Sequence, residues 1–289
     1  MLIAAHEPEG YEGLLVSVEV DIRRGIPAVD LVGLAAGAVK EARERVRAAS
    51  RNSGFDFPLD RVLVSLAPAS FPKEGPGYDL PIALAVLCAS GALPDPGRPF
   101  LASGELMLDG RVRPVRGILA AVAAGLGAGI EDFVVPLENV VEARSLGRGR
   151  IHGLSRLGEA VDVLGRLRQG QEPEDPLSQG LGGLQSLAKP GAEGDLSEIR
   201  GLPRLRRALE VAAAGSHHLL LFGPPGSGKT MAARRLPSLI PDLGEEEAIE
   251  VTKLQSLAGL LPEVHGLIRR PPFRAPHHSA SREGLVGGG

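Results

Sequence analysis

Apolar and polar residues alternate with two different periods in the N-terminal part of the chain. Residues 16–22 place Val or Ile at every second position, with Ser, Glu and Asp between them, which predicts a half-buried strand. Between about residues 35 and 52, apolar residues recur every three or four positions instead, which predicts an amphipathic helix. Glu41 stands four positions before Arg45 in this helix, a spacing that allows an ion pair.

Further apolar segments predict the rest of an N-terminal domain. Residues 62–66 alternate as a strand does, and residues 81–90 are nearly all apolar, as in a buried helix that ends before Gly91. Asp109-Gly110 predicts a hairpin with a two-residue turn. The remaining expected elements are a helix, a strand and a helix at residues 117–126, 133–135 and 157–167. Strands and helices do not alternate regularly, so we expect an α+β domain.

The composition changes between residues 169 and 194, where Gly, Pro and Gln are frequent and β-branched residues are rare. Such a composition is typical of a linker. We therefore expect an N-terminal domain at 1–168, a linker at 169–194 and a second domain at 195–289. In the second domain a helix is predicted from Pro203 to Ala214, whereas residues 269–279 are too rich in proline for a helix interior.

A glycine-rich motif in the second domain predicts nucleotide binding. Residues 223–230 match the phosphate-binding loop pattern G-x-x-x-x-G-K-[ST], and we expect a buried strand before the loop, at 218–222, and a helix after it, at 231–236. Backbone N–H groups of such a loop point at phosphate oxygens. Lys229 would reach the β and γ phosphates, and the Thr230 hydroxyl would bind Mg²⁺. The predicted ATP-binding residues are Gly223, Pro224, Pro225, Gly226, Ser227, Gly228, Lys229 and Thr230.

Composition narrows the possible classes of protein. With 289 residues the chain can form two domains, and its net charge of −3 argues against a polybasic nucleic-acid binder. The single cysteine, Cys88, lies in an apolar segment and predicts a core thiol, not a disulfide or a zinc site. Seven Phe, two Tyr and no Trp leave few rings to stack on bases. Without a leader or a long apolar segment, we expect a cytoplasmic protein with no membrane partner.

Two N-terminal segments resemble the proteolytic domain of the Lon family. They are Pro72-Lys73-Glu74-Gly75-Pro76-Gly77 and the ten residues from Gly110 to Leu119. In that family a nucleophilic serine follows the first motif and a catalytic lysine belongs to the second. Gly77 and Leu119 stand at these two positions here. Neither residue supplies a hydroxyl or an amine, so we expect no protease activity. Ser70 precedes the motif and has no lysine at the matching distance.

The second domain resembles the AAA+ ATPase module of the magnesium chelatase I-subunit family. The resemblance rests on residues 195–201, the phosphate loop and the segment Phe273–Ser281, which contains F-R-x-P-H-H. An inactive Lon-like domain ahead of this module is similar to the bacterial YifB/ComM family. The resemblance implies an α+β Lon-protease-like domain followed by a partial α/β P-loop AAA+ domain. It also implies ATP and Mg²⁺ as cofactors, a homohexamer, and a DNA-dependent motor for branch migration in DNA uptake and recombination.

The family continues into the Walker B acidic pair, the sensors and the arginine finger just where this sequence ends, at Leu285–Gly289. We therefore expect this chain to bind ATP without hydrolysing it and to hold no catalytic residue of its own. Two alternatives remain: a chelatase-like motor, or a non-enzymatic scaffold with a vestigial nucleotide pocket. The N-terminal domain favours the DNA motor, because the chelatase subunit is expected to resemble only the ATPase part.

Several histidines and arginines allow two interpretations. His277 and His278 could bind a metal, but neighbours on an extended segment point opposite ways, which favours loop hydrogen bonds or a subunit contact. His217 and His218 are interpreted as structural. Three basic residues could contact a DNA backbone or pair with another subunit: Arg269, Arg270 and Arg274.

Two further groups of charges are expected to be mainly solvated surface. Residues 40–47 carry Glu41 and Glu44 among their arginines, which argues against a nucleic-acid site. The predicted hairpin is basic and is a secondary candidate for DNA contact through Arg111, Arg113 and Arg116.

Overall fold

The computed structural model describes residues 2–172, 194–261, 266–276 and 279–281. Its contacts divide the chain into two compact units. The first unit consists of Met1–Gln185 and Thr252–Leu267, and the second of Ser186–Val251 and Ile268–Gly289. The first unit therefore takes residues from both sides of the phosphate-loop motif in the sequence.

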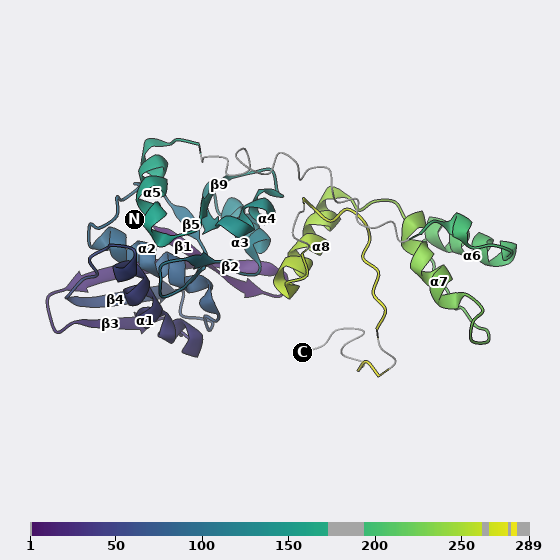
Figure 1. Ribbon diagram of the computed structural model, residues 1–289, viewed down its shortest axis with the longest axis horizontal. Coiled ribbons are helices and arrows are strands. Elements are labelled where there is room, and N and C mark those ends of the chain that lie inside the picture. The colour runs from purple at the N-terminus through teal and green to yellow at the C-terminus, as the bar shows by residue number, and fades with distance from the viewer. Residues whose placement is uncertain (1, 173–193, 262–265, 277–278, 282–289) are drawn as a thin grey trace. The chain divides into compact units, whose positions relative to one another are not determined.

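A seven-stranded mixed sheet forms the centre of the first unit, with the strand order β3-β4-β2-β1-β5-β8-β9 (Figure 1). The β1–β2 and β2–β4 pairs are antiparallel, and the other neighbouring pairs are parallel. The strands are β1 (Ile3–Glu9), β2 (Glu12–Arg23), β3 (Ala28–Val32), β4 (Arg61–Ala67), β5 (Phe100–Ala102), β8 (Asp132–Pro136) and β9 (Arg150–Leu154).

Five α-helices of the N-terminal segment accompany the sheet. They are α1 (Gly37–Asn52), α2 (Asp79–Ala89), α3 (Ile118–Gly127), α4 (Val140–Arg144) and α5 (Ala160–Gln169). Short 3-10 turns are η1 (Pro76–Tyr78), η2 (Leu137–Asn139) and η3 (Leu157–Glu159). Helix α2 is apolar on all sides and is buried almost throughout, whereas α1 buries one face.

The apolar residues form two clusters on opposite faces of the sheet. Ile3 and Ala5 of β1 belong to the cluster that includes α1, α2 and α5, whereas Ala4 belongs to the cluster that includes α3 and α4. The same alternation occurs in β5, where Leu101 differs from its two neighbours. Successive side chains of a strand point to opposite faces, so helices cover both sides of the sheet.

The predicted hairpin is present but its turn is longer than predicted. Strands β6 (Glu105–Leu106) and β7 (Val112–Arg113) pair antiparallel. Met107 N–H donates to the Arg111 carbonyl (2.9 Å), so residues 108–110 form a three-residue loop. Gly110 has φ +83°, but Asp109 does not adopt a positive φ, which the predicted two-residue turn would require at both positions.

The second unit has helices but no strand among its described residues. Its elements are η5 (Leu196–Glu198), α6 (Pro203–Ala214), α7 (Lys229–Arg235), η6 (Leu236–Leu239) and the first half of α8 (Glu245–Ala258). The predicted strand at 218–222 is wrong: Leu220 is 91% and Phe222 99% exposed. A strand needs a neighbour for its backbone hydrogen bonds, and the described residues of this unit supply none. The α/β character expected of this part is thus not found in them.

Most of the other predicted elements are confirmed. The strands at 16–22, 62–66 and 133–135 correspond to β2, β4 and β8, and the predicted helices correspond to α1, α2, α3, α5, α6 and α7. Residues 269–276 form neither helix nor strand. Strands β1, β3, β5 and β9 and helices α4 and α8 were not predicted. Within the described part of the chain, no helix is long and apolar enough to cross a membrane.

Candidate functional site

The helix that follows the phosphate loop, α7, is fixed by apolar and ionic contacts within the second unit. Ala232 of α7 packs in a small core with Leu196, Ile199 and Leu209. At the end of α7, Arg235 Nη2 lies 2.6 Å from Glu198 Oε2. The Arg235 guanidinium holds the pKa of Glu198 below its usual value. These contacts attach α7 to the 195–199 segment.

The loop itself follows the geometry that its glycines allow. Gly226 has φ +80° and Gly228 has φ +83°, in the left-handed region that residues with a side chain rarely adopt. Residues 224–227 are exposed. The loop therefore presents its backbone to solvent ahead of the first turn of α7.

Lys229 is held by oxygen atoms of the loop. Its Nζ donates to the carbonyl oxygens of Gly223 and Pro224, both at 2.7 Å, and to Ser227 Oγ at 3.2 Å. All three acceptors are neutral, so the charge of the ammonium has no counterion among these contacts. Phosphate oxygens would be stronger, charged acceptors for the same group.

The loop residues fit a phosphate with bound Mg²⁺. Thr230, the next residue of α7, is exposed and its hydroxyl is accessible. No group of three or more His, Cys, Asp or Glu side chains is placed to hold a metal ion in the part of the chain that the structure describes. A metal at this loop would thus use the Thr230 hydroxyl together with phosphate oxygens and water.

The two positions that resemble a protease site lie in the first unit and carry no reacting group. Gly77 is in η1, and a Cβ atom there would lie 3.1 Å from the Oγ of Ser103. Leu119 is fully buried in α3. Ser70 is exposed in a turn. Lys73, although fully buried, donates from Nζ to the carbonyl oxygens of Pro68 and Phe71. The motif lysine therefore binds backbone oxygens.

A buried carboxylate from β1 holds the segment that resembles the Lon motif. Glu7 Oε2 accepts hydrogen bonds from the Tyr78 hydroxyl (2.7 Å) and from the Glu74 N–H (3.0 Å). Burial raises the pKa of Glu7, and the two hydrogen bonds act in the opposite direction. Sequence reasoning missed this residue, because Glu7 lies about seventy positions away from its partners.

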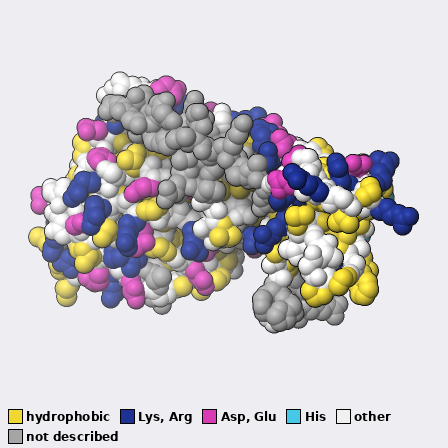
Figure 2. Space-filling model, turned by 45° about the vertical axis from the view of Figure 1, so that its right-hand side comes forward, with side chains coloured by type: hydrophobic (Ala, Val, Ile, Leu, Met, Phe, Trp, Pro, Cys, Tyr) yellow, Lys and Arg dark blue, Asp and Glu magenta, His cyan; other side chains and the backbone are white. Residues whose placement is uncertain are grey.

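The other residues singled out in the sequence lie at the surface or outside the described part. Exposed positions are those of His217, His218, Arg269, Arg270, Arg274, Arg111, Arg113 and Arg116. In the hairpin, Arg111 Nε lies 2.8 Å from Asp109 and Arg113 Nη1 lies 3.9 Å from Glu105. Lys and Arg side chains are interspersed with Asp and Glu on the face seen in Figure 2. His277, His278 and residues 282–289 lie outside the described residues, as do 173–193 of the predicted linker.

Cys88 and Arg45 show how far local predictions extend. Cys88 is partly buried against the larger core, and its burial raises the pKa of the thiol to about 12. Arg45 Nη1 lies 3.7 Å from Glu41, as the helical spacing predicts. The same arginine makes a shorter contact, 2.7 Å, with Asp79. Only the tertiary structure shows this second partner.

Family models match both parts of the chain. The model described as subunit ChlI of Mg-chelatase matches residues 18–139, and the model described as magnesium chelatase, subunit ChlI, matches residues 195–289. A Lon protease from Geobacter metallireducens is 25% identical over 72% of this chain and 25% of its own length. With the mixed sheet of the first unit, this similarity indicates a Lon-like domain.

Longer relatives match nearly the whole chain. YifB from Salmonella typhimurium is 40% identical over 95% of this chain and 52% of its own length. The competence protein ComM from Haemophilus influenzae is 40% identical over 97% of this chain and 54% of its own length. An uncharacterized protein from Mycobacterium tuberculosis is 46% identical over the same shares. The chain thus spans about half the length of the curated relatives it matches, and it belongs to the YifB/ComM family of Mg-chelatase-like proteins.

Proposed function

We propose that residues 223–230 bind ATP with Mg²⁺ and that the chain is the nucleotide-binding part of an AAA+ ATPase. The observation that carries the proposal is the set of contacts at Lys229, whose ammonium is surrounded by neutral loop oxygens only. A triphosphate would supply the negative charge that these oxygens lack. The left-handed glycines Gly226 and Gly228 leave the loop backbone open to such a ligand.

Each loop residue has a defined role in this proposal. Lys229 binds the β and γ phosphates, and backbone N–H groups of the loop bind phosphate oxygens. The Thr230 hydroxyl is a ligand for Mg²⁺, which neutralises phosphate charge when it is bound. The contact between Arg235 and Glu198 keeps α7, and with it Lys229 and Thr230, in place.

For the full-length protein we propose a DNA-dependent motor, assembled as a hexamer, that acts in DNA uptake and recombination. The similarity to a competence protein supports this function. Exposed Arg269, Arg270 and Arg274 supply the positive charge that contact with a DNA backbone requires. The chain spans about half the length of its relatives, so the proposal assigns nucleotide binding to these residues and hydrolysis to the longer protein.

A chelatase-like motor is the second candidate, and a specific observation favours it. The sequence argument against it assumed that a chelatase subunit resembles only the ATPase part. Residues 18–139 nevertheless match a family model named for the ChlI subunit of Mg-chelatase. The N-terminal domain therefore does not separate the two functions by itself.

ATP hydrolysis by the full-length protein tests the proposed function and separates the candidates. The rate is measured with and without single-stranded and branched DNA, for the wild type and for the Lys229→Ala variant. Arg234→Ala is a matched control, because Arg234 is an exposed basic residue of the same helix. We expect DNA to stimulate the wild type and the control but not Lys229→Ala. An ATPase rate that is indifferent to DNA would contradict the DNA motor and favour the chelatase-like function.

A further inference from the structure

Helix α8 belongs to both units of the chain. Residues 245–251 fall in the second unit, which contains the phosphate loop, whereas residues 252–258 fall in the first, Lon-like unit. Thr252 is 1% and Ser256 3% exposed, although both are polar. Buried polar side chains are normally hydrogen-bonded, and these two lie on one side of the helix, four positions apart. The C-terminal half of α8 therefore has a polar face packed within the Lon-like unit.

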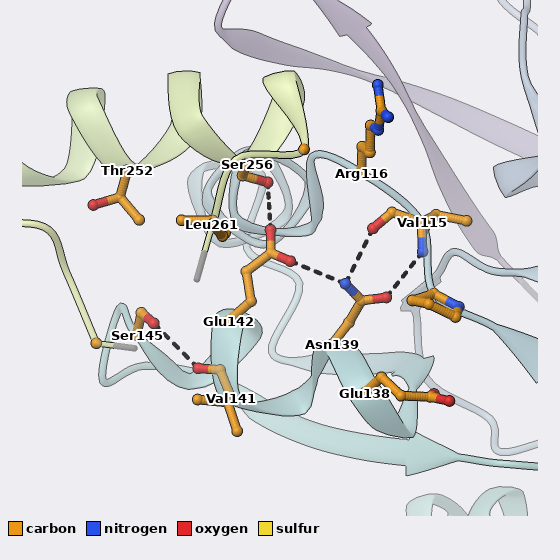
Figure 3. A pocket seen from close by; sticks show the side chains of 13 residues that line it. Val115, Arg116, Glu138, Asn139, Val141, Glu142, Ser145, Thr252, Ser256 and Leu261 are labelled. Atoms are coloured by element: carbon orange, nitrogen blue, oxygen red, sulfur yellow. Dashed lines mark hydrogen bonds between the residues drawn. The ribbon is translucent and has the colours of Figure 1, made fainter. Parts of the chain in front are cut away.

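Ser256 joins α8 to two segments of the Lon-like unit (Figure 3). Its hydroxyl donates to Glu142 Oε1 and accepts a hydrogen bond from the Gly117 N–H at 2.9 Å. The same Glu142 oxygen accepts the Leu119 N–H at 2.9 Å. Gly117 and Leu119 belong to the segment that resembles the lysine motif of Lon proteases. The backbone of that segment, in place of a catalytic side chain, thus makes the contact with α8.

The Glu142 carboxylate is held in position before Ser256 reaches it. Asn139 Nδ2 donates to Glu142 Oε2 at 2.9 Å, and the Asn139 amide forms two hydrogen bonds with the backbone of Val115, both at 3.0 Å. Figure 3 shows Asn139 between Val115 and Glu142. A charged acceptor that is already oriented makes a stronger hydrogen bond than a neutral or mobile one. Glu142 is therefore suited to bind a helix hydroxyl.

Packing around Ser256 is as close as the hydrogen bonds. A Cβ atom at Gly117 would lie 2.6 Å from Leu257 Cδ2, so the helix approaches the backbone at a position where only glycine fits. The contact lines a pocket of about 450 Å³ that also includes Arg116, Ser145 and Thr252. Close approach, burial and a charged hydrogen bond together define a specific docking site for residues 252–258.

We propose that Ser256 is a docking residue through which α8 couples nucleotide binding to the Lon-like unit. The inference rests on the nucleotide function proposed above. Docking orders residues 252–258, and because the helix is continuous, it also restricts residues 245–251 of the unit that contains the phosphate loop. Nucleotide binding then has less ordering left to impose, which makes the two events mutually favourable.

Titration of this chain with Mg²⁺-ATP tests the coupling. We expect Ser256→Ala to raise the Kd for Mg²⁺-ATP at least about fivefold, the lower range of measured couplings between sites. Ser90→Ala is the matched control: its hydroxyl donates to the Leu87 carbonyl within α2, and the Kd should not change. Glu142→Gln weakens the same contact by removing its charge, and it replaces Ser256→Ala if that variant does not fold.

Amide hydrogen exchange at Gly117 provides an independent measurement of docking. The Gly117 N–H is bonded to the Ser256 hydroxyl, so its exchange should be faster in Ser256→Ala and slower in the wild type when Mg²⁺-ATP is added. Unchanged exchange in Ser256→Ala would contradict the docking contact. Faster exchange with a Kd within twofold of the wild type would contradict the coupling and leave the nucleotide function intact. If the wild type itself does not bind Mg²⁺-ATP, the proposed function fails and the coupling fails with it.

Discussion

The two units differ in how their apolar segments are covered. In the Lon-like unit, Leu66 of β4 and Leu84 of α2 are fully buried, because strands pair on both sides of β4 and helices cover both faces of the sheet. In the second unit, Leu220 and Phe222 are almost fully exposed, and hydrophobic side chains lie at the surface of this part in Figure 2. The same kind of apolar segment therefore forms a strand only where a neighbouring strand supplies hydrogen bonds.

The largest difference is expected for ion pairs. Asp79 is fully buried and receives two hydrogen bonds from the Arg45 guanidinium, at 2.7 and 2.9 Å. Burial raises the pKa of Asp79, and Arg45 opposes this shift. Arg45→Ala leaves the carboxyl buried without its cation and should lower the free energy of unfolding by about 3–5 kcal/mol. Chemical denaturation measures this change.

The exposed pair Arg207–Glu210 of α6 is the matched control for Arg45→Ala. Its two side chains are 76% and 43% exposed. Solvent screens such a pair, so Arg207→Ala should change the free energy of unfolding by less than about 1 kcal/mol. Equal effects of the two substitutions would show that Asp79 and Arg45 are solvated and would remove this part of the comparison.

Leucine truncation should sharpen the comparison next. Leu84→Ala would leave a cavity in the core of the Lon-like unit and should lower the free energy of unfolding by about 2–5 kcal/mol. Leu220→Ala removes a side chain that contacts mainly solvent and should change it by less than about 0.5 kcal/mol. A large loss of stability in Leu220→Ala would mean that residues 218–222 are covered, in disagreement with the structure.

The smallest effect is a dependence on pH that comes from His6 in β1. His6 is buried, its Nε2 has no hydrogen-bond partner among the described residues, and burial lowers its pKa to about 4. The unfolded chain binds a proton near pH 6.5, so the stability due to neutral His6 is present above that pH and is lost as the pH falls toward 4. The loss should reach about 2 kcal/mol at pH 5.

Denaturation midpoints between pH 7.5 and 5 measure this effect. His6→Gln should show a smaller decrease in stability on acidification than the wild type. The control His217→Gln changes an exposed histidine and should keep the wild-type decrease. A slope that His6→Gln does not alter would place the acid sensitivity elsewhere in the chain.

Local periodicity predicted the elements whose partners matter least for their formation. Helices α1 and α6 follow from helical spacing and from Pro203, and β2 follows from its alternation. Strand β1 was missed because His6 and Glu7 interrupt its apolar pattern, although both are buried in the fold. The strand expected at 218–222 failed because its pattern was suitable but no partner strand is described.

The phosphate loop could be located from sequence, since one contiguous motif contains its residues. The contact of Ser256 with Glu142 and Gly117 could not, because it joins positions more than one hundred residues apart. The polar residues Thr252 and Ser256, four positions apart, are an insufficient signal by themselves. Only the fold shows that they lie on the Lon-like unit.

Calorimetric titration with Mg²⁺-ATP tests the central claim, nucleotide binding at the phosphate loop, most directly. The wild type, Lys229→Ala and Arg234→Ala are compared under identical conditions. Loss of a charged hydrogen bond of about 1.5–3 kcal/mol predicts that Lys229→Ala binds about 10- to 150-fold more weakly. Arg234→Ala should bind as the wild type does. Binding by Lys229→Ala that is as tight as that of the wild type would contradict the claim.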